Sequence, residues 1–287
     1  MDKVAFLGLG TMGAGMAARV AASGFPLVVW NRSAERAGAF DGRADIAASP
    51  GDAAAAADIV VAMLADDAAS RATWLGADGV LSRARRGTLF IESSTLSPAW
   101  VVELAAAADA AGCEFLDAPV TGSKAQAANG ELRFLAGGSA AAVARATPVL
   151  TTMGTNIVHV GPIASGARLK LINNFLCGVQ AASLAEAVAV IERSGLDLDA
   201  ALSVLVNGAP GSPLVKAVSA RMAKSDYTVN FSMNLLRKDL TYAIDEAMLH
   251  GVPLTTVLTA RELFLRATER GLGDRDFSAV VELTRQG

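Results

Sequence analysis

The sequence predicts an α/β fold in which a doubly wound parallel sheet is followed by an all-helical domain. Over residues 1–162, short apolar strands alternate with helical segments, which is typical of a parallel sheet covered by helices on both faces. Over residues 163–287 the apolar spacing is helical, and we predict no strand there. Pro148, Pro162 and several glycines lie near this change. We therefore place a domain boundary between residues 162 and 163.

The strands expected in the first domain are short apolar runs bounded by glycine or polar residues. They span Val4–Leu7, Leu27–Trp30, Asp58–Met63, Gly87–Glu92 and Glu114–Asp117. A helix over Ala14–Ser23 connects the first two strands and stops at Gly24. Another helix spans Pro98–Ala111, with Ser97 as its N-cap and a proline at its first position.

The second domain opens with a long apolar helix over Gly166–Arg193. The uncharged part, Leu171–Ala185, is shorter than the roughly 18–20 apolar residues of a membrane span, and it carries asparagine and glutamine. A helix with so many apolar residues is expected to be buried between domains or between subunits. Further helices are expected at 198–206, 213–224, 232–249, 255–270 and 276–285.

Composition excludes several classes of protein. Hydrophobic residues make up 52% of the chain, which argues against overall disorder. A net charge of −3 without a sustained basic block disfavours nucleic-acid binding. Cys113 and Cys177 lack the spacing of a metal site or a disulfide framework, so we expect neither. The first strand begins almost at once, without a secretory segment, and we expect a soluble, cytoplasmic protein without a membrane partner.

A glycine-rich turn after the first strand is the strongest functional signal. Glycines at this spacing permit a tight turn and a close approach of the backbone to a pyrophosphate, and the helix that follows supplies N–H donors. Because the motif lies within a βαβ unit, it predicts a Rossmann-type dinucleotide site. Its residues are Gly8, Leu9, Gly10, Thr11, Met12 and Gly13.

The end of the second strand indicates which dinucleotide binds. NAD-specific folds usually place an acidic residue there, which bonds the ribose 2′-hydroxyl. This chain has Asn31, Arg32 and Ser33 instead. An arginine beside small hydrogen-bonding groups favours a 2′-phosphate, which a carboxylate would repel. The sequence therefore predicts NADP(H) as the cofactor.

Four motifs together resemble the β-hydroxyacid dehydrogenase family, which includes the 3-hydroxyisobutyrate dehydrogenases. Residues 8–17 are similar to its cofactor signature, Asp117–Lys124 to its substrate loop, Gly166–Asn174 to its catalytic helix and Lys238–Leu240 to its C-terminal element. The motifs occur in the family's order and span nearly the whole chain. The Gly-Ser-Lys form of the loop and the Asn-Arg-Ser strand end resemble the glyoxylate/succinic semialdehyde reductase branch.

Lys170 is the candidate catalytic residue, by resemblance and by its chemistry. It lies in a strongly apolar helix with Asn173 and Asn174 at i+3 and i+4, which puts the three near one face. Reduction of a carbonyl develops negative charge on oxygen, and a positioned ammonium stabilises that charge and donates the proton. We expect Asn174 to orient the lysine or the substrate, and Asn173 to lie in the substrate site.

The loop after the strand 114–117 carries groups suited to a substrate carboxylate. Thr121, Gly122 and Ser123 offer hydroxyl and backbone N–H donors. Thr121 stands where the family usually has serine. Residues 125–127 lack a proline that the reductase branch often has, which leaves the size of the substrate open.

The resemblance also assigns residues that spacing alone leaves open. The resemblance brings Phe231 and Asp239 to the substrate and Lys238 to the cofactor, whereas the sequence alone favours a core phenylalanine and a solvated charge pair. Two strand ends are also expected to contact the cofactor, because ligands of such sheets bind at the carboxyl ends of the strands. The residues are Met63, Leu64, Ala65 and Thr95.

We therefore expect an NADPH-dependent oxidoreductase that reduces small aldehyde acids, such as glyoxylate to glycolate and succinic semialdehyde to 4-hydroxybutyrate. Three alternatives stay open: a 3-hydroxyisobutyrate-type dehydrogenase that uses NAD, an imine reductase, and a catalytically silent NADP-binding module. Lys170 argues against the imine reductases, which usually have another residue at that position. Pairing of the helical domains in the family implies a homodimer or a homotetramer.

Overall fold

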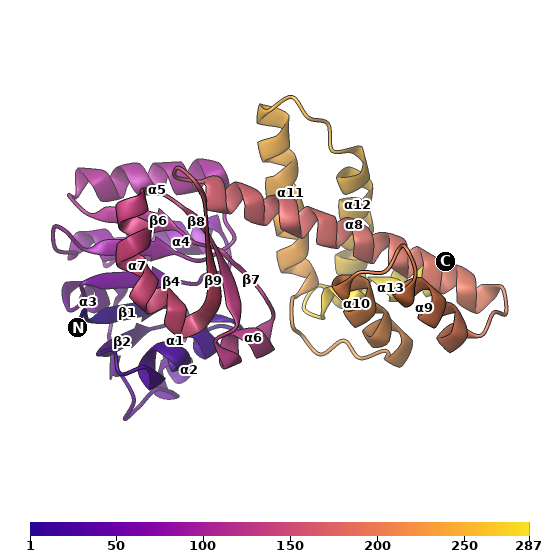
Figure 1. Cartoon of the computed structure of the whole chain (residues 1–287), viewed down its shortest axis with the longest axis horizontal. Coiled ribbons are helices and arrows are strands. Elements are labelled where there is room, and N and C mark those ends of the chain that lie inside the picture. The colour runs from indigo at the N-terminus through magenta and orange to yellow at the C-terminus, as the bar shows by residue number, and fades with distance from the viewer. Residues whose placement is uncertain (287) are drawn as a thin grey trace. The chain divides into compact units, whose positions relative to one another are not determined.

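The computed structural model describes residues 1–286 and divides the chain between Lys170 and Leu171 into two compact units. The first unit holds a nine-stranded sheet with its covering helices, and the second consists of helices (Figure 1). The predicted boundary lies eight residues earlier, after residue 162. The difference arises because the first turns of the long helix pack on the first unit, as the contacts of its start show below.

Six parallel strands form most of the sheet, in the order β3-β2-β1-β4-β5-β6. The chain reverses its direction of travel between β1 and β4, and in such sheets ligands bind at the carboxyl ends of the strands beside this point. These strands are β1 (Val4–Leu7), β2 (Leu27–Trp30), β3 (Asp45–Ile46), β4 (Ile59–Ala62), β5 (Leu89–Glu92) and β6 (Glu114–Asp117).

The last three strands change the character of the sheet. They are β7 (Val120–Thr121), β8 (Leu132–Gly137) and β9 (Gly154–Gly161). β8 runs antiparallel to β6 and β7 and parallel to β9. The predicted parallel sheet therefore ends in a mixed edge, where β8 turns back against β6 and β7. Residues 122–131, which join β7 to β8, are fewer than the dozen or so that a parallel crossover needs.

Helices cover both faces of the sheet, and alternate residues of each strand point into two separate cores. Phe6 and Val29 pack with Met16 on one face, whereas Leu7 packs with Trp74 on the other. Side-chain caps on Asp66, Ser97 and other residues begin several of the helices. The helices are α1 (Gly13–Ala22), α2 (Ala34–Gly38), α3 (Pro50–Ala55), α4 (Asp67–Leu75), α5 (Pro98–Ala110), α6 (Lys124–Asn129) and α7 (Ala140–Met153), with a short 3₁₀ turn at Val80–Ser82.

The second unit is a bundle of helices around its own apolar core. Its longest member, α8 (Ser165–Arg193), begins in the first unit. Leu236, Leu240 and Phe264 are among the side chains buried against α8 residues such as Val188. The others are α9 (Leu198–Asn207), α10 (Pro213–Lys224), α11 (Met233–Leu249), α12 (Thr255–Ala267) and α13 (Val281–Gln286), with a wide turn at Thr268–Leu272 and a 3₁₀ turn at Phe277–Val280.

α8 is the helix of residues 1–286 that is long and apolar enough to cross a membrane. Half of its most apolar stretch is buried inside the protein, and residues such as Ala181, Ala185 and Val188 belong to the core of the second unit. A core helix of this length passes the same test of length and composition. Its burial therefore accounts for its apolar character.

The structure confirms the predicted fold class: a doubly wound sheet precedes an all-helical region. All five predicted strands are present, within one or two residues of their predicted ends. β3 and β7 escape prediction because each has two residues. β8 and β9 escape it because their pairing with each other defines them, and most side chains of β9 are exposed. In the second unit, the segment expected at 276–285 is a 3₁₀ turn followed by a short α-helix.

Candidate active site

The glycine-rich turn combines two packing glycines with one open position. Gly8 has a φ of +95°, and a Cβ there would lie 2.2 Å from the carbonyl oxygen of Met63. A Cβ on Gly13 would lie 1.9 Å from the carbonyl oxygen of Gly8. At Gly10 the nearest atom is Nη1 of Arg36, 3.7 Å away. The turn therefore packs tightly against the protein at Gly8 and Gly13 but leaves its backbone accessible at Gly10. A backbone that binds a pyrophosphate must be accessible in this way.

The end of β2 is tied to the glycine-rich turn by a side chain. The Leu9 N–H donates to Asn31 Oδ1 at 2.8 Å, and Asn31 Nδ2 donates to the Ser33 carbonyl at 3.0 Å. Asn31 thus braces two segments of backbone, while Arg32 and Ser33 are exposed beside it. Of the remaining residues of the turn, Leu9 is buried and Thr11 is exposed, with Met12 packed partly against the core.

Arg36 is a site residue that sequence reasoning missed. It lies on α2, is exposed, and directs its guanidinium toward the open side of Gly10. Its nearness to Gly10 depends on how α2 packs beside the turn, so no local sequence pattern gave it away. A guanidinium at this place suits an anionic ligand.

The carboxyl ends of β4 and β5 lie side by side, since these strands are neighbours in the sheet. Met63, Leu64 and Ala65 follow β4, and Thr95 comes shortly after β5. The Met63 N–H donates to the Leu7 carbonyl at 2.8 Å, which ties the end of β4 to the end of β1. The structure thus places all four expected residues at the sheet edge that carries the glycine-rich turn.

The expected substrate loop is partly closed on itself. Thr121 ends β7, and Gly122 has a φ of +136°, a value that favours glycine. The N–H of Ser123 donates to Oε1 of Gln126 at 2.6 Å. Gln126 lies in the stretch that lacks the branch's usual proline, and its side chain occupies the backbone donor of Ser123, one of the residues predicted to bind the substrate.

Asp117, at the end of β6, holds the start of α8. Its Oδ1 accepts the Ala164 N–H at 2.8 Å, and its Oδ2 accepts the Ala167 N–H at 2.9 Å. Burial raises the pKa of Asp117 to about 6, and the hydrogen bonds from these backbone groups oppose the rise. Lys170 follows Ala167 by three residues, so this carboxylate positions the turn that carries the candidate catalytic lysine.

Two further residues lock the entry of α8. A Cβ on Gly166 would lie 2.0 Å from the Leu135 carbonyl oxygen and 2.8 Å from Asp117 Oδ2, so only glycine allows the helix to lie this close to the sheet. Ala164 is buried and has a φ of +70°, a conformation that costs a non-glycine residue energy. Such strain persists where the surrounding contacts impose it, and here they do so beside Lys170.

In the second unit, Asn174 and Asp239 form a buried pair. Asn174 is 3% exposed and Asp239 is 1% exposed. Asn174 Nδ2 donates to Asp239 Oδ2 at 2.6 Å, and Asn173 Nδ2 donates to Asn174 Oδ1 at 3.0 Å. Lys238 Nζ lies 2.9 Å from Asp239 Oδ1 and 5.0 Å from the centre of the Tyr242 ring. Four of the expected residues are therefore joined in one polar chain.

Phe231 is held by a different set of contacts. Its ring packs edge-on against Phe277, with the ring centres 5.8 Å apart. Its N–H donates to Oδ2 of Asp276 at 3.1 Å, and the N–H of Asn230 donates to the same oxygen at 2.9 Å. Asp276, which is 1% exposed, thus fixes the segment before α11. Sequence reasoning missed this role because the partners of Asp276 lie some 45 residues away in the chain.

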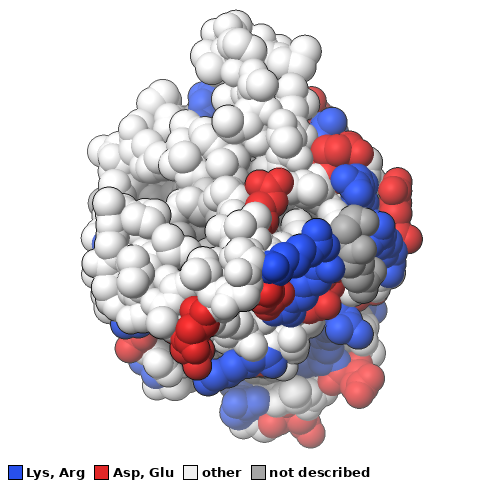
Figure 2. Space-filling model, turned by 90° about the vertical axis from the view of Figure 1, so that its right-hand side faces the viewer, with Lys and Arg blue, Asp and Glu red and all other residues white. Residues whose placement is uncertain are grey.

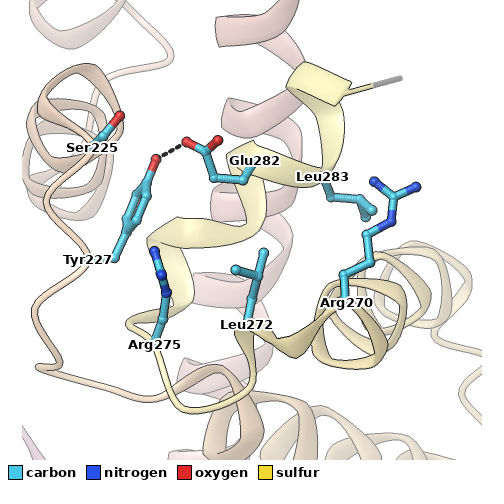
Figure 3. Close-up of a pocket in the computed structure, with 7 residues that line it drawn as sticks. All are labelled: Ser225, Tyr227, Arg270, Leu272, Arg275, Glu282 and Leu283. Atoms are coloured by element: carbon cyan, nitrogen blue, oxygen red, sulfur yellow. Dashed lines mark hydrogen bonds between the residues drawn. The ribbon is translucent and has the colours of Figure 1, made fainter.

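A cavity of about 370 Å³ lies in the second unit (Figure 3). Two arginines, Arg270 and Arg275, line it together with Tyr227 and Glu282, whose side chains are hydrogen-bonded to each other. Among residues 1–286, the side chains that line this cavity include none of the residues predicted for the site. Within residues 1–286, no group of three or more His, Cys, Asp or Glu side chains is arranged to hold a metal ion.

Comparison with known proteins assigns the chain to a family. Residues 3–161 match the NAD-binding domain of 6-phosphogluconate dehydrogenase, and residues 164–284 match the NAD-binding region of NADP-dependent 3-hydroxyisobutyrate dehydrogenase. The chain belongs to the β-hydroxyacid dehydrogenase family. It is therefore an NAD(P)-dependent oxidoreductase that acts on CH–OH groups, and the resemblance drawn from its motifs is confirmed.

Relatives within the family cover the full chain. Glyoxylate/succinic semialdehyde reductase 1 of Arabidopsis thaliana is 31% identical, over 99% of this chain and 98% of the relative. The mitochondrial 3-hydroxyisobutyrate dehydrogenase of Rattus norvegicus is 32% identical over 99% of this chain and 87% of the relative. Among solved structures, the Mycobacterium tuberculosis 3-hydroxyisobutyrate dehydrogenase with L-serine has a TM-score of 0.90 at 32% identity, covering 99% of both chains.

Proposed function

We propose that this protein reduces small aldehyde acids, such as glyoxylate and succinic semialdehyde, to hydroxy acids with NADPH, and that Lys170 donates the proton. The observation that carries the proposal is the locked start of α8. Asp117 and Gly166 fix the turn before Lys170, as a catalytic group requires of its support. The similarity to the Arabidopsis reductase supports the same class of substrate.

The preference for NADPH rests on the end of β2. Asn31 occupies the position where an acidic residue would bond a ribose 2′-hydroxyl, and its side chain is committed to the backbone. Arg32 is exposed beside it, and the exposed Arg36 of α2 directs its guanidinium toward Gly10. The two guanidinium groups suit a 2′-phosphate, and the open backbone at Gly10 suits a pyrophosphate.

The bound nicotinamide would supply the hydride to the carbonyl carbon. As hydride arrives, negative charge grows on the carbonyl oxygen. The ammonium of Lys170 stabilises this charge and transfers a proton to the oxygen, which yields the alcohol. The donors of Thr121, Gly122 and Ser123 suit the substrate carboxylate, and binding through the Ser123 N–H requires Gln126 to release it.

A substrate panel tests the proposal. Aldehyde acids of two to five carbons would be assayed with NADPH and with NADH, and the matching hydroxy acids with NADP⁺ and NAD⁺. We expect the largest kcat/KM for a short aldehyde acid with NADPH. The rival is a 3-hydroxyisobutyrate-type dehydrogenase, which the relatives in rat and M. tuberculosis favour. Faster oxidation of 3-hydroxyisobutyrate with NAD⁺ would establish that rival instead.

The exposed apolar side chains of the second unit support a homodimer or a homotetramer. Val204 of α9 is 72% exposed, although a solvated helix normally turns such residues inward. Figure 2 shows a wide area without charged side chains, which includes the tip where α11 passes into α12. The other large exposed apolar residues of this unit are Ile172, Leu176, Val190, Leu196, Met248, Leu249, Val252 and Leu258.

Light scattering tests the assembly directly. We expect a mass of at least twice the 29.3 kDa of one chain at micromolar concentration. Val204→Glu places a charge on the apolar face of α9 and should shift the population toward the monomer, while Glu103→Gln on α5 serves as the control. A mass near 29.3 kDa for the unmodified protein would contradict assembly.

A further inference from the structure

Glu92 is a buried carboxylate that the proposed reaction does not use. It is the last residue of β5 and is 1% exposed. Its Oε2 accepts Ser70 Oγ at 2.9 Å and Trp74 Nε1 at 2.7 Å. Its Oε1 accepts both the N–H of Ser94, at 3.0 Å, and the hydroxyl of Ser94. The carboxylate thus receives four hydrogen bonds from neutral donors inside the first unit.

The direction of each hydrogen bond in this cluster is determined by the donors. Trp100 Nε1 donates to Ser70 Oγ at 2.9 Å, so the single proton of that hydroxyl is left for Glu92. In the same way the Leu64 N–H donates to Ser94 Oγ at 2.6 Å, and the Ser94 proton is left for Glu92. Burial raises the pKa of Glu92, and the hydrogen bonds from Ser94, Trp74 and Ser70 oppose that rise. Four donors around Glu92 fit a carboxylate, which accepts hydrogen bonds and has no proton to donate.

The cluster joins the two loops that follow β4 and β5. Leu64 lies between Met63 and Ala65, and Ser94 immediately precedes Thr95. These loops belong to the half of the sheet formed by β4, β5 and β6. In a doubly wound sheet each half binds one mononucleotide, and the first half of this sheet carries the glycine-rich turn and Arg32. The second half is therefore the one that receives the nicotinamide mononucleotide.

We propose that Glu92 is a positioning residue for the nicotinamide half of the cofactor, acting through Ser94 on the backbone at Leu64 and Thr95. This inference rests on the proposed function, because it requires a nicotinamide dinucleotide that donates hydride. Glu92 touches neither the cofactor nor the substrate in this account. It determines where two cofactor-binding loops lie relative to each other.

Glu92→Gln tests the inference. Glutamine presents one oxygen and one NH₂ group, so on one side of its amide a donor must face another donor. We expect kcat/KM with NADPH to fall roughly ten- to a hundredfold, as for the loss of a hydrogen bond to a charged group. Binding of adenosine 2′,5′-bisphosphate, which fills only the first half of the site, should change by less than about twofold. This second measurement separates a local shift of two loops from a general loss of structure.

Two serine variants give a matched pair. Ser94→Ala breaks the link from Glu92 to Leu64 and should reproduce the effect of Glu92→Gln. Ser70→Ala removes a donor from the other oxygen of Glu92 and leaves that link intact, so its kcat/KM should stay within about threefold of the unmodified enzyme. In the double variant of Glu92→Gln and Ser94→Ala, the losses should fail to add, since both residues act through the same link from Glu92 through the Ser94 hydroxyl to Leu64.

The inference is overturned if Glu92→Gln keeps its kcat/KM within about threefold, or if adenosine 2′,5′-bisphosphate binds as poorly as NADPH does. Should Glu92→Gln fail to fold, Ser94→Ala carries the same test, and unmodified kinetics in that variant overturn the inference. If the unmodified protein reduces no aldehyde acid, the proposed function fails, and the ratio of NADPH binding to adenosine 2′,5′-bisphosphate binding still tests the role of Glu92. If it uses NADH, the matching pair is NADH and ADP.

Discussion

The two halves of the sheet prepare their strand ends by opposite means. At the end of β2 the chain presents exposed cations, Arg32 and Arg36, beside an open glycine backbone. At the ends of β5 and β6 it buries the carboxylates of Glu92 and Asp117 and surrounds them with donors from loops and from a helix start. The exposed cations are available to a ligand, whereas the buried carboxylates accept their hydrogen bonds from groups of the protein itself.

This difference separates selection of the ligand from positioning of the reacting groups. An exposed arginine contributes affinity only when an anion arrives, and its loss leaves the fold intact. A buried carboxylate that accepts several backbone and side-chain donors fixes those donors whether or not a ligand is present. Variants in the two regions should therefore differ in what they change: the choice of cofactor in the first, and the rate and stability in the second.

The largest effect is expected at Lys170, since the buried Asp117 positions the helical turn before it. Lys170→Met removes the proposed proton donor and should lower kcat by about 10²- to 10⁴-fold, the usual contribution of a general acid. The loss should fall on kcat because the interaction strengthens as charge develops on the substrate oxygen. Lys170→Arg should not restore activity, since guanidinium gives up its proton too reluctantly near neutral pH. Steady-state kinetics beside NADPH titration measure both quantities.

The control for Lys170→Met is Lys216→Met, which removes an exposed lysine of α10 and should leave kcat unchanged. NADPH binding should survive in both variants, because the glycine-rich turn and Arg32 are distant in sequence and depend on other contacts. A kcat within about threefold of the unmodified enzyme would contradict the role of Lys170 as general acid.

Asp117 should give the next largest effect, visible as a pH dependence of stability. Its pKa is about 6 in the folded protein and about 3.9 in an unfolded chain, so the folded state binds the proton more tightly. Its contribution to the free energy of unfolding is therefore greatest below pH 4 and falls by about 3 kcal/mol as the pH rises through 6. Asp117→Asn cannot titrate and should lack this fall.

Urea unfolding of both proteins at several pH values between 4 and 7 provides the measurement. The difference between the unmodified protein and Asp117→Asn isolates this carboxyl from the other acidic groups, which titrate in both. A difference that stays constant across this range would show that Asp117 keeps an ordinary pKa.

The smallest of the three effects is expected at Arg32, the residue proposed to favour NADPH over NADH. Arg32→Ala should weaken NADPH binding roughly 10- to 150-fold, as for a hydrogen bond to a charged group, and should change NADH binding little. Arg36, whose guanidinium lies by Gly10, offers a matched comparison. If it serves the pyrophosphate, Arg36→Ala should weaken NADPH and NADH alike. Fluorescence titration with both cofactors distinguishes the two patterns, and a preference of the unmodified enzyme for NADH would refute the assignment of Arg32.

Local sequence signals were sufficient for the features that depend on neighbouring residues. The strand Val4–Leu7, the turn that follows it and the long apolar helix each carry their pattern within a short window. The polar residues of α8 were likewise recognisable, because Lys170 and Asn174 interrupt an apolar run at helical spacing. The fold class therefore followed from the sequence, as did the places of the candidate residues on their strand ends and helices, whereas the roles of those residues stay predictions.

The buried carboxylates were not recognisable because their roles depend on distant partners. Glu92 and Asp117 each end a strand, where an acidic residue ordinarily meets solvent. Ser70 lies 22 residues from Glu92, and Ala164 lies 47 residues from Asp117, so no local pattern joins them. β8 and β9 were missed for a related reason, since their pairing defines them more than their composition does.

The three glycines of the glycine-rich turn also bear on how this enzyme can be redesigned. Positions 8 and 13 are closed to any side chain, because a Cβ at either would collide with backbone oxygen. At position 10 a Cβ would meet Nη1 of Arg36 at an ordinary contact distance of 3.7 Å, so a substitution there changes the surface offered to the dinucleotide while leaving the scaffold in place. A library directed at a synthetic or truncated cofactor should therefore randomise position 10 with positions 32 and 36, and keep the other two glycines invariant.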